Sequence, residues 1–155
     1  MAARSRTRSP LVVPVWTGEA TAFVAAARAG RLATIRHDGS PHIVPLCFCF
    51  DGAAFFSVID RKPKRVEPEE LQRVRNILER PQVTLLVDRY SEDWSRLGFV
   101  MVYGQARLLR DGKLRDRAIE LLREKYSQYR EMDLEGRPVI QMVPQRVVSW
   151  GNLSP

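Results

Sequence analysis

The stretch that decides the fold is RLATIRHDGSPHIVPLCFCFDGAAFFSVID, residues 31–60. Three apolar runs in it are separated by Asp38-Gly39 and Asp51-Gly52, dipeptides that are typical of tight hairpin turns. We therefore expect three antiparallel strands, over residues 31–36, 41–50 and 53–60. The middle run is apolar at both odd and even positions, which predicts a strand buried on both faces. Pro45 within it marks a point where the ladder lacks a donor.

The flanking sequence predicts three helices and three further strands. The helices are expected from Thr17 to Gly30, from Pro68 to Arg80, and from Asp111 to Tyr129. The strands are expected over residues 83–87, 99–109 and 139–150, the last one broken at Pro144. All strand connections are hairpins or short crossings, so we expect a mainly β fold, a six-stranded antiparallel barrel with peripheral helices.

Length and composition point to one folded unit. The 155 residues fit a single domain over 13–155, preceded by a basic N-terminal tail over 1–12. The longest apolar runs are too short to cross a bilayer, so we expect no membrane contact. Cys47 and Cys49 are too few for a zinc site, and lone thiols suit a reducing cytoplasm, where we expect the protein to be located.

The charge of the chain predicts an anionic ligand. The net charge is +7 and many of the cations fall between residues 61 and 80. Ser57 at a strand end, followed by several lysines and arginines, can hold a phosphate through charge-assisted hydrogen bonds. The alternative is an ordinary solvated basic loop. Nucleic-acid binding is a weaker explanation, because the aromatic residues do not interleave with the basic cluster as a stacking platform requires.

The order of these segments resembles a known family. The segments are residues 31–46, Phe55-Phe56-Ser57, Lys62-Pro63-Lys64-Arg65, Arg75-Asn76-Ile77 and 81–87. They are similar to the pyridoxamine 5'-phosphate oxidase-like flavin and deazaflavin oxidoreductases, and closest to their branch of F420-dependent enzymes. The resemblance extends roughly from Thr17 to Leu109. It implies an FMN-binding split barrel that forms a homodimer, with two coenzyme sites built from both subunits.

The resemblance also implies the residues of the coenzyme site. Positions along the coenzyme ring and sugar-like chain correspond to His42, Val44, Pro45 and Cys47, and positions near the ring and tail to Phe56 and Ser57. The phosphate site corresponds to Lys62, Lys64 and Arg65. Two weaker members of the coenzyme site are Arg75 and Asn76. The implied activity is hydride transfer between F420 and a small organic substrate. FMN is the alternative coenzyme, and a flavin or F420 carrier without turnover is the alternative function.

Two departures from the family pattern bear on the coenzyme and the substrate. Phe99 stands where the flavin-using oxidases have a glutamine that touches the flavin. The chain also ends without the arginine and histidine that hold pyridoxamine phosphate, which argues against oxidation of vitamin B6. The surplus cations would also face the carboxylates of a glutamate tail, which favours F420 over FMN.

Overall fold

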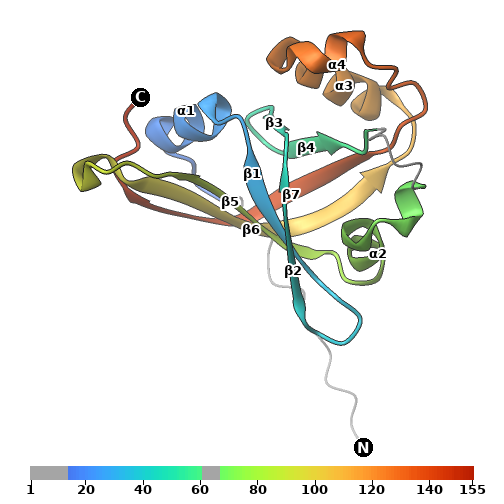
Figure 1. Cartoon of the computed structure of the whole chain (residues 1–155), viewed down its shortest axis with the longest axis horizontal. Helices are drawn as coiled ribbons and strands as arrows, with labels where there is room; N and C mark the ends of the chain where they lie inside the picture. The colour runs from blue at the N-terminus through green and yellow to red at the C-terminus, as the bar shows by residue number, and fades with distance from the viewer. Residues whose placement is uncertain (1–13, 61–66) are drawn as a thin grey trace, which may run out of the picture.

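In the described residues, seven strands form one curled antiparallel sheet in the order β2-β1-β5-β6-β7-β4-β3 (Figure 1). The computed structural model describes residues 14–60 and 67–155, so the expected tail 1–12 lies outside the described residues. The strands are β1 (Gly30–Ile35), β2 (Pro41–Leu46), β3 (Cys49–Phe50), β4 (Phe55–Val58), β5 (Gln82–Arg89), β6 (Gly98–Leu109) and β7 (Val139–Gly151). The helices are α1 (Gly18–Ala26), α2 (Gln72–Glu79), α3 (Lys113–Lys125) and α4 (Ser127–Glu131), with 3-10 turns η1 (Pro68–Glu70) and η2 (Trp94–Arg96). The expected mainly β, antiparallel architecture is confirmed.

The two outermost strands of this sheet, β2 and β3, follow each other in the sequence. Only Cys47 and Phe48 separate them, so the Cα atoms of Leu46 and Cys49 lie at most about 11 Å apart. The sheet must therefore curl until its two edges approach each other. Among the described residues β2 pairs with β1 alone, so the barrel is split along the outer edge of β2.

The crossing from β2 to β3 is held by a tyrosine that follows α3. The hydroxyl of Tyr126 accepts a hydrogen bond from the Phe48 N–H (3.0 Å). It also lies 2.9 Å from the carbonyl oxygen of Phe48 and 3.0 Å from that of Arg28, and it can donate its proton to either. Burial raises the pKa of Tyr126 to about 12, so the hydroxyl keeps its proton. The side chain thus pairs backbone groups that no neighbouring strand reaches.

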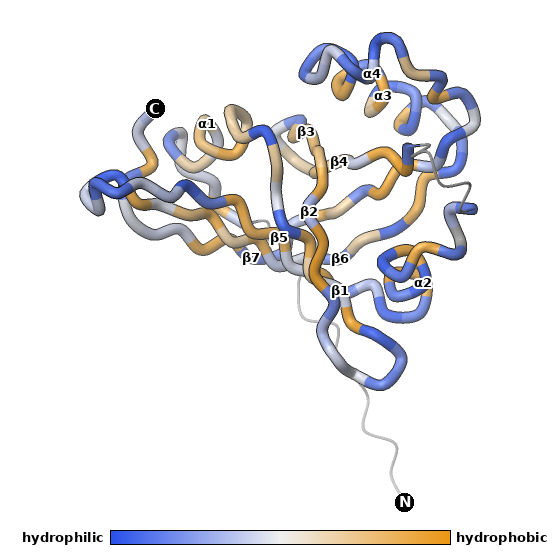
Figure 2. Tube along the Cα trace, viewed as in Figure 1, coloured by the Kyte–Doolittle hydropathy of each residue, from blue (hydrophilic) through white to orange (hydrophobic). Residues whose placement is uncertain are grey.

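The sheet separates two hydrophobic clusters. One fills the barrel, where apolar residues of α1 and α2 pack onto the inward rows of the strands. The other lies between β4 and the pair α3 and α4. Strand β4 is buried on both faces, because Phe55 and Ser57 face the barrel while Phe56 and Val58 face the helices. Figure 2 shows that hydrophobic residues are concentrated in the strands, whereas the turns are mostly hydrophilic.

The expected strand over 41–50 is two strands rather than one. The crossing at Cys47 and Phe48 interrupts its ladder, so the sheet has seven strands instead of the expected six. The middle run is also not buried on both faces, since the outward side chain of Ile43 is 63% exposed. The apolar pattern alone does not reveal which neighbours a strand has, and here the neighbour changes within the run.

Two further boundaries differ from expectation. The first helix ends at Ala26 instead of reaching Gly30, because Gly30 already pairs with Leu46 as the first residue of β1. Strand β7 is not broken at Pro144 but passes it with a bulge, where the pairing with β6 shifts beside Gly104. A Cβ atom at Gly104 would collide with the carbonyl of Val143, so glycine is required at the bulge.

The outward side of β1, β2, β5, β6 and β7 carries two mainly apolar rows, each with one arginine, and no helix in the described part of the chain (Figure 1). Cross-strand partners form each row. The first row consists of Pro45, Arg31, Leu86, Met101 and Val148, and the second of Ile43, Ala33, Thr84, Tyr103 and Arg146. Phe99 and Trp150 continue the surface and stack with ring centres 5.8 Å apart. We call these residues the outer sheet face. An uncovered face of this composition indicates an interaction surface.

Replacing Tyr126 by phenylalanine tests the contact that holds the crossing. The variant leaves the Phe48 backbone groups buried without their partner, so we expect Tyr126→Phe to lower the free energy of unfolding by about 2 kcal/mol in urea. Tyr103→Phe is the control, because among the described residues the Tyr103 hydroxyl has only the sulfur of Met101 as a hydrogen-bond partner, at 3.6 Å. We expect less than ~0.5 kcal/mol from the control. Equal losses in both variants would refute the role of Tyr126.

Lys125 lies beside the same crossing without a counter-ion. Its Nζ atom is buried, has no hydrogen-bond partner among the described residues, and lies 4.2 Å from the centre of the Phe48 ring. Burial lowers the pKa of Lys125 to about 8; the Cys49 thiol opposes this shift and Arg28 adds to it. The folded chain therefore carries the cost of a poorly solvated cation at neutral pH.

We expect Lys125→Met to be more stable than the wild type at pH 7, by about 1 kcal/mol once partial exposure is allowed for. The unfolded amine keeps its proton to about pH 10.5 but the folded one only to about pH 8, so wild-type stability should rise above pH 8. Cys49, whose pKa burial raises from 9.0 to about 12, offsets this rise above pH 9, because the unfolded thiol loses its proton there and the folded one keeps it. Thermal unfolding at pH 7, 8 and 9 should show the rise in the wild type, and in the variant no rise and a small fall at pH 9 from Cys49. A variant less stable than the wild type at pH 7 would contradict the assignment.

Candidate functional site

The outer edge of β2 is the free edge of the barrel, and two prolines keep it free. Pro41 and Pro45 lack a backbone N–H, and a strand accommodates proline only where that nitrogen faces away from its neighbour. Pro41, Ile43 and Pro45 direct their backbone nitrogens away from β1, and of these three only Ile43 has an N–H to donate. Another strand could therefore not pair with the edge, which leaves it available to a ligand.

Strand β2 presents different residues on its two faces. His42, Val44 and Leu46 point inward and are half-buried, whereas Ile43 and Pro45 are exposed on the outer sheet face. Val44 and Pro45, both expected at the coenzyme, therefore face opposite sides of the strand. Only a ligand that lies along the edge itself could contact both of them.

Helix α2 is fixed beside this edge by a buried polar contact. The Asn76 side-chain amide donates to the Thr34 hydroxyl at 2.8 Å, and Gln72 donates to the Asn76 carbonyl at 2.7 Å. Thr34 is the cross-strand partner of His42, so the contact places α2 next to the inward side of β2. Asn76, expected as a coenzyme contact, thus has both ends of its amide engaged within the chain.

The cation that α2 directs toward the site is Arg73. Residues on a helix turn by about 100° each, which places Arg73 between the buried Asn76 and Ile77, and Arg75 on the opposite side. Arg75 is exposed and donates to Gln72 at 2.9 Å. Arg73 is half-buried and makes no hydrogen bond or ion pair with another described residue; burial lowers its pKa, while Asp60 and Tyr129 raise it.

His42 has an unused polar atom in the same place. Its Nδ1 atom is buried and has no hydrogen-bond partner among the described residues. Burial lowers the pKa of His42 from its usual 6.5, and the positive charges of Arg36 and Arg73 lower it further. At neutral pH the ring is therefore uncharged and can accept or donate a hydrogen bond to a bound group.

Asp60, which follows β4, and Tyr129 of α4 act electrostatically on Arg73. The Tyr129 hydroxyl donates to the Asp60 carboxylate at 3.4 Å. Burial raises the pKa of Tyr129, and Asp60 and Cys47 add to that rise. Cys47 is a free, half-buried thiol in this neighbourhood, and Cys49 is free and buried. Side chains from β2, α2, the end of β4 and α4 thus influence one another electrostatically.

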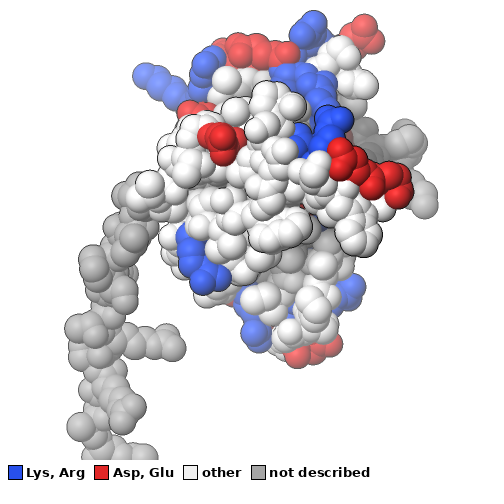
Figure 3. Space-filling model, turned by 90° about the vertical axis from the view of Figure 1, so that its left-hand side faces the viewer, with Lys and Arg blue, Asp and Glu red and all other residues white. Residues whose placement is uncertain are grey.

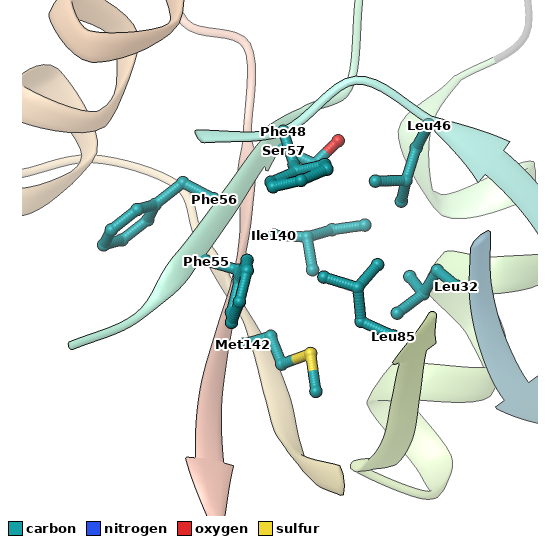
Figure 4. A pocket seen from close by; sticks show the side chains of 9 residues that line it. All are labelled: Leu32, Leu46, Phe48, Phe55, Phe56, Ser57, Leu85, Ile140 and Met142. Atoms are coloured by element: carbon teal, nitrogen blue, oxygen red, sulfur yellow. The ribbon is translucent and has the colours of Figure 1, made fainter. Parts of the chain in front are cut away.

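The other two expected residues of β4 lie on opposite faces. Ser57 faces a small hollow in the barrel, where it is the only polar residue among apolar side chains (Figure 4). The space available to a guest there is about 10 Å³, about enough for one water molecule, so a coenzyme cannot enter the barrel. Phe56 is buried beneath α3 and α4, away from the open edge.

Three expected phosphate ligands, Lys62, Lys64 and Arg65, lie outside the described residues. Within residues 14–60 and 67–155 there is no group of three histidine, cysteine or carboxylate side chains that could hold a metal ion. No helix in the same ranges is long and apolar enough to cross a bilayer.

Of the residues around this edge, His42 is named as a candidate in the sequence analysis, whereas Arg73, Asp60 and Tyr129 are not. A hydrophobic pattern predicts that Leu78 is buried in α2, but Leu78 is 57% exposed. Asn76 is buried instead of Leu78, because the Asn76 amide donates to the Thr34 hydroxyl. As a result Arg73 lies on the inward side of α2. No signal in the local sequence shows that a polar residue will be buried in this way.

The chain is similar to known proteins in sequence and in fold. The family model described as pyridoxamine 5'-phosphate oxidase matches residues 16–151. Among curated proteins none matches the chain. Solved structures with the same fold include the conserved hypothetical protein Rv2991 from Mycobacterium tuberculosis, with TM-score 0.72 and 22% identity over 95% of this chain and 90% of that one.

Two other similar structures have functions in their names. A heme binding protein from Mycobacterium smegmatis has TM-score 0.70 and 20% identity over 88% of this chain and 54% of that one. An F420 reductase has TM-score 0.64 and 21% identity over 86% of this chain and 98% of that one. At these identities the structures show a shared fold, a split barrel, and the fold accommodates more than one kind of ligand.

Proposed function

The chain belongs to the pyridoxamine 5'-phosphate oxidase family, and from that premise we propose that it is an oxidoreductase that binds the deazaflavin F420 along the open edge of β2. It transfers a hydride between the coenzyme and a small organic substrate. FMN is the alternative coenzyme. The family and its structural neighbours include oxidoreductases, which supports this class of activity.

The observation that carries the proposal is the unpaired edge of β2 beside His42. A flat ring with carbonyl and N–H groups on its rim suits an edge that offers the Ile43 N–H, the unpartnered Nδ1 of His42 and the apolar side chain of Val44. Such a mixture of apolar surface with a few polar groups is typical of coenzyme sites.

The coenzyme, when bound, supplies the hydride chemistry, and the chain's own residues bind and orient it. His42 is neutral at pH 7 and can hold one polar atom of the ring rim in place. The prolines of β2 exclude a competing strand from the same edge. Free thiols at Cys47 and Cys49 agree with a location in a reducing cytoplasm.

F420 is preferred to FMN for two reasons. Phe99, which stands in place of the glutamine implied by the flavin-using relatives, stacks on Trp150 and offers no polar group to a ring. The cations near the site, Arg36 and Arg73, suit a coenzyme that carries carboxylates in addition to a phosphate. The first reason concerns the rim of the coenzyme ring and the second its tail, and neither concerns the hydride transfer.

We further propose that two copies pair through the outer sheet face. Trp150 is 56% exposed on it, Ile43 more so, and several half-buried apolar residues lie between them. Figure 3 shows an uncharged area in the middle of the left-hand side of the molecule, with Lys, Arg, Asp and Glu residues around it. Arg31 and Arg146 are the charged members of this face. Enrichment in aromatic residues and arginine is typical of protein interfaces. The pairing would bring a second subunit to the edge of β2.

The first test is a titration of the purified protein with F420, FMN and hemin, followed by fluorescence for the first two and absorbance for the third. We expect a Kd for F420 in the micromolar range or below and at least ~10-fold weaker binding of FMN, about 1.4 kcal/mol. Tighter FMN binding would move the protein to the flavin-using branch. Tight hemin binding without binding of either coenzyme would overturn the proposal, as would binding of none. Bound F420 that no donor and acceptor pair turns over would favour a carrier.

The dimer proposal is tested by Ile43→Glu, which places a charge on the outer sheet face without disturbing the core. Light scattering after gel filtration should show a dimer for the wild type and a monomer for the variant, because a charge buried at an interface is costly. Leu78→Glu is the matched control, since Leu78 is similarly exposed but lies on α2, away from that face. A wild-type monomer, or a dimer that survives Ile43→Glu, would contradict the proposed interface.

A further inference from the structure

We propose that Lys125 is a site of reversible modification by carbon dioxide, which joins the lysine amine as a carbamate beside Arg28. The site lies where the chain crosses from β2 to β3, and it involves neither His42 nor the free edge of β2. The proposal does not depend on the proposed function. It stands on the burial of the amine, the rings that enclose it and the charges around it.

The amine of Lys125 is enclosed by aromatic rings instead of hydrogen-bond acceptors. Its Nζ atom is buried and has no hydrogen-bond partner among the described residues. It lies 4.2 Å from the centre of the Phe48 ring and 5.5 Å from the centre of the Tyr126 ring. Lys125 is the last residue of α3 and is half-buried as a whole, so part of its side chain reaches the surface while the amine is covered. A small uncharged molecule can enter such a place, whereas a large charged reagent cannot.

The charges near this amine are unbalanced. The guanidinium of Arg28 lies 4.8 Å from the centre of the Tyr126 ring, so two cations approach one ring. Arg28 is exposed, and its guanidinium has no hydrogen-bond or ion-pair partner among the described residues. The described groups that act on the pKa of Lys125 are Arg28 and the thiols of Cys47 and Cys49, with no carboxylate among them. An anion formed at Nζ would therefore meet an unpaired guanidinium and no competing carboxylate.

Carbon dioxide matches this environment in size and in charge. The uncharged amine attacks its carbon atom: a C–N bond forms, one C=O double bond becomes a C–O⁻ single bond, and one proton passes from the nitrogen to water. Burial lowers the pKa of Lys125 to about 8, with Cys49 opposing this shift and Arg28 adding to it. At pH 7.5 about a quarter of the amine is thus uncharged, compared with ~0.1% of an ordinary lysine.

The product replaces a poorly solvated cation with an anion that Arg28 can neutralise. The added group must turn toward Arg28 and away from the Phe48 ring, because the face of an aromatic ring is negative. The exposed side chain of Arg28 is free to follow it. The unfolded amine keeps its proton to about pH 10.5 and reacts far less, so carbon dioxide should stabilise the folded chain.

The test exposes the purified protein to isotope-labelled carbon dioxide at pH 7.5, fixes the carbamates by ethylation with triethyloxonium, and locates them by mass spectrometry of peptides. We expect at least ~10-fold more label on Lys125 than on the exposed Lys113, because more of the Lys125 amine is uncharged. Arg28→Gln should lower the label on Lys125 by about 3- to 10-fold, the scale of one partly exposed charge pair. The matched control is Arg117→Gln, which removes an exposed arginine of α3 that is already paired with Glu120 at 3.1 Å. The control should change the label less than ~2-fold.

Label on the α-amino group of Met1 shows that the reaction has worked, since the ordinary pKa of an α-amino group is about 8. With that label present, the absence of label from Lys125 would overturn the proposal, as would equal label on Lys125 and Lys113. Undiminished label on Lys125 in Arg28→Gln would overturn the placement of the carbamate beside Arg28.

Thermal unfolding gives a second readout that does not rely on trapping. At constant pH and ionic strength, carbon dioxide should raise the Tm of the wild type and leave that of Lys125→Arg unchanged, because a guanidinium keeps its proton and forms no carbamate. No rise in the wild type, or an equal rise in both proteins, would contradict the proposal. Neither measurement needs a coenzyme, so failure here is distinct from failure of the proposed function.

Discussion

The structure depends on the hydrogen bonds between the Tyr126 hydroxyl and the backbone of Phe48. At Phe48 the chain leaves one edge of the sheet and joins the other, and a backbone between two edges has no strand beside it. A buried N–H and C=O without partners would cost as much as several ordinary contacts provide. Tyr126 supplies both partners, so the two edges can be close together without pairing with each other. The split in the barrel, and with it the free edge of β2, follows from that arrangement.

Local sequence predicts the parts of this fold that local chemistry controls. The Asp-Gly turns are hairpins in which Gly39 and Gly52 have φ values of 85° and 96°, and Thr17 caps α1 as its position suggests. The change of neighbours at Phe48 could not be predicted, because its cause lies 78 residues away at Tyr126. Contacts of that separation leave no periodic signal in the strand itself.

The candidate site shows the same division. His42 was predicted and lies at the open edge with an unpartnered nitrogen. Arg73 was not predicted, because a hydrophobic pattern assigns buried positions to leucine before asparagine. The Thr34 hydroxyl makes Asn76 the cheaper residue to bury and leaves Leu78 in solvent. Tertiary contacts of this kind override local patterns most often where polar groups are enclosed, and a ligand site is such a place.

The alternation of side chains along β2 connects the two proposed interactions. His42 faces the candidate site and the next residue, Ile43, lies on the outer sheet face. A ligand along the edge and a second copy on the face would therefore touch adjacent residues of one short strand. Among the described residues β2 pairs with β1 alone. Ligand binding and pairing of two copies would therefore each order the backbone of β2, and each interaction requires that backbone to be ordered. Binding free energies linked in this way are reciprocal: to the extent that pairing of two copies strengthens coenzyme binding, the coenzyme must strengthen the pairing by the same factor.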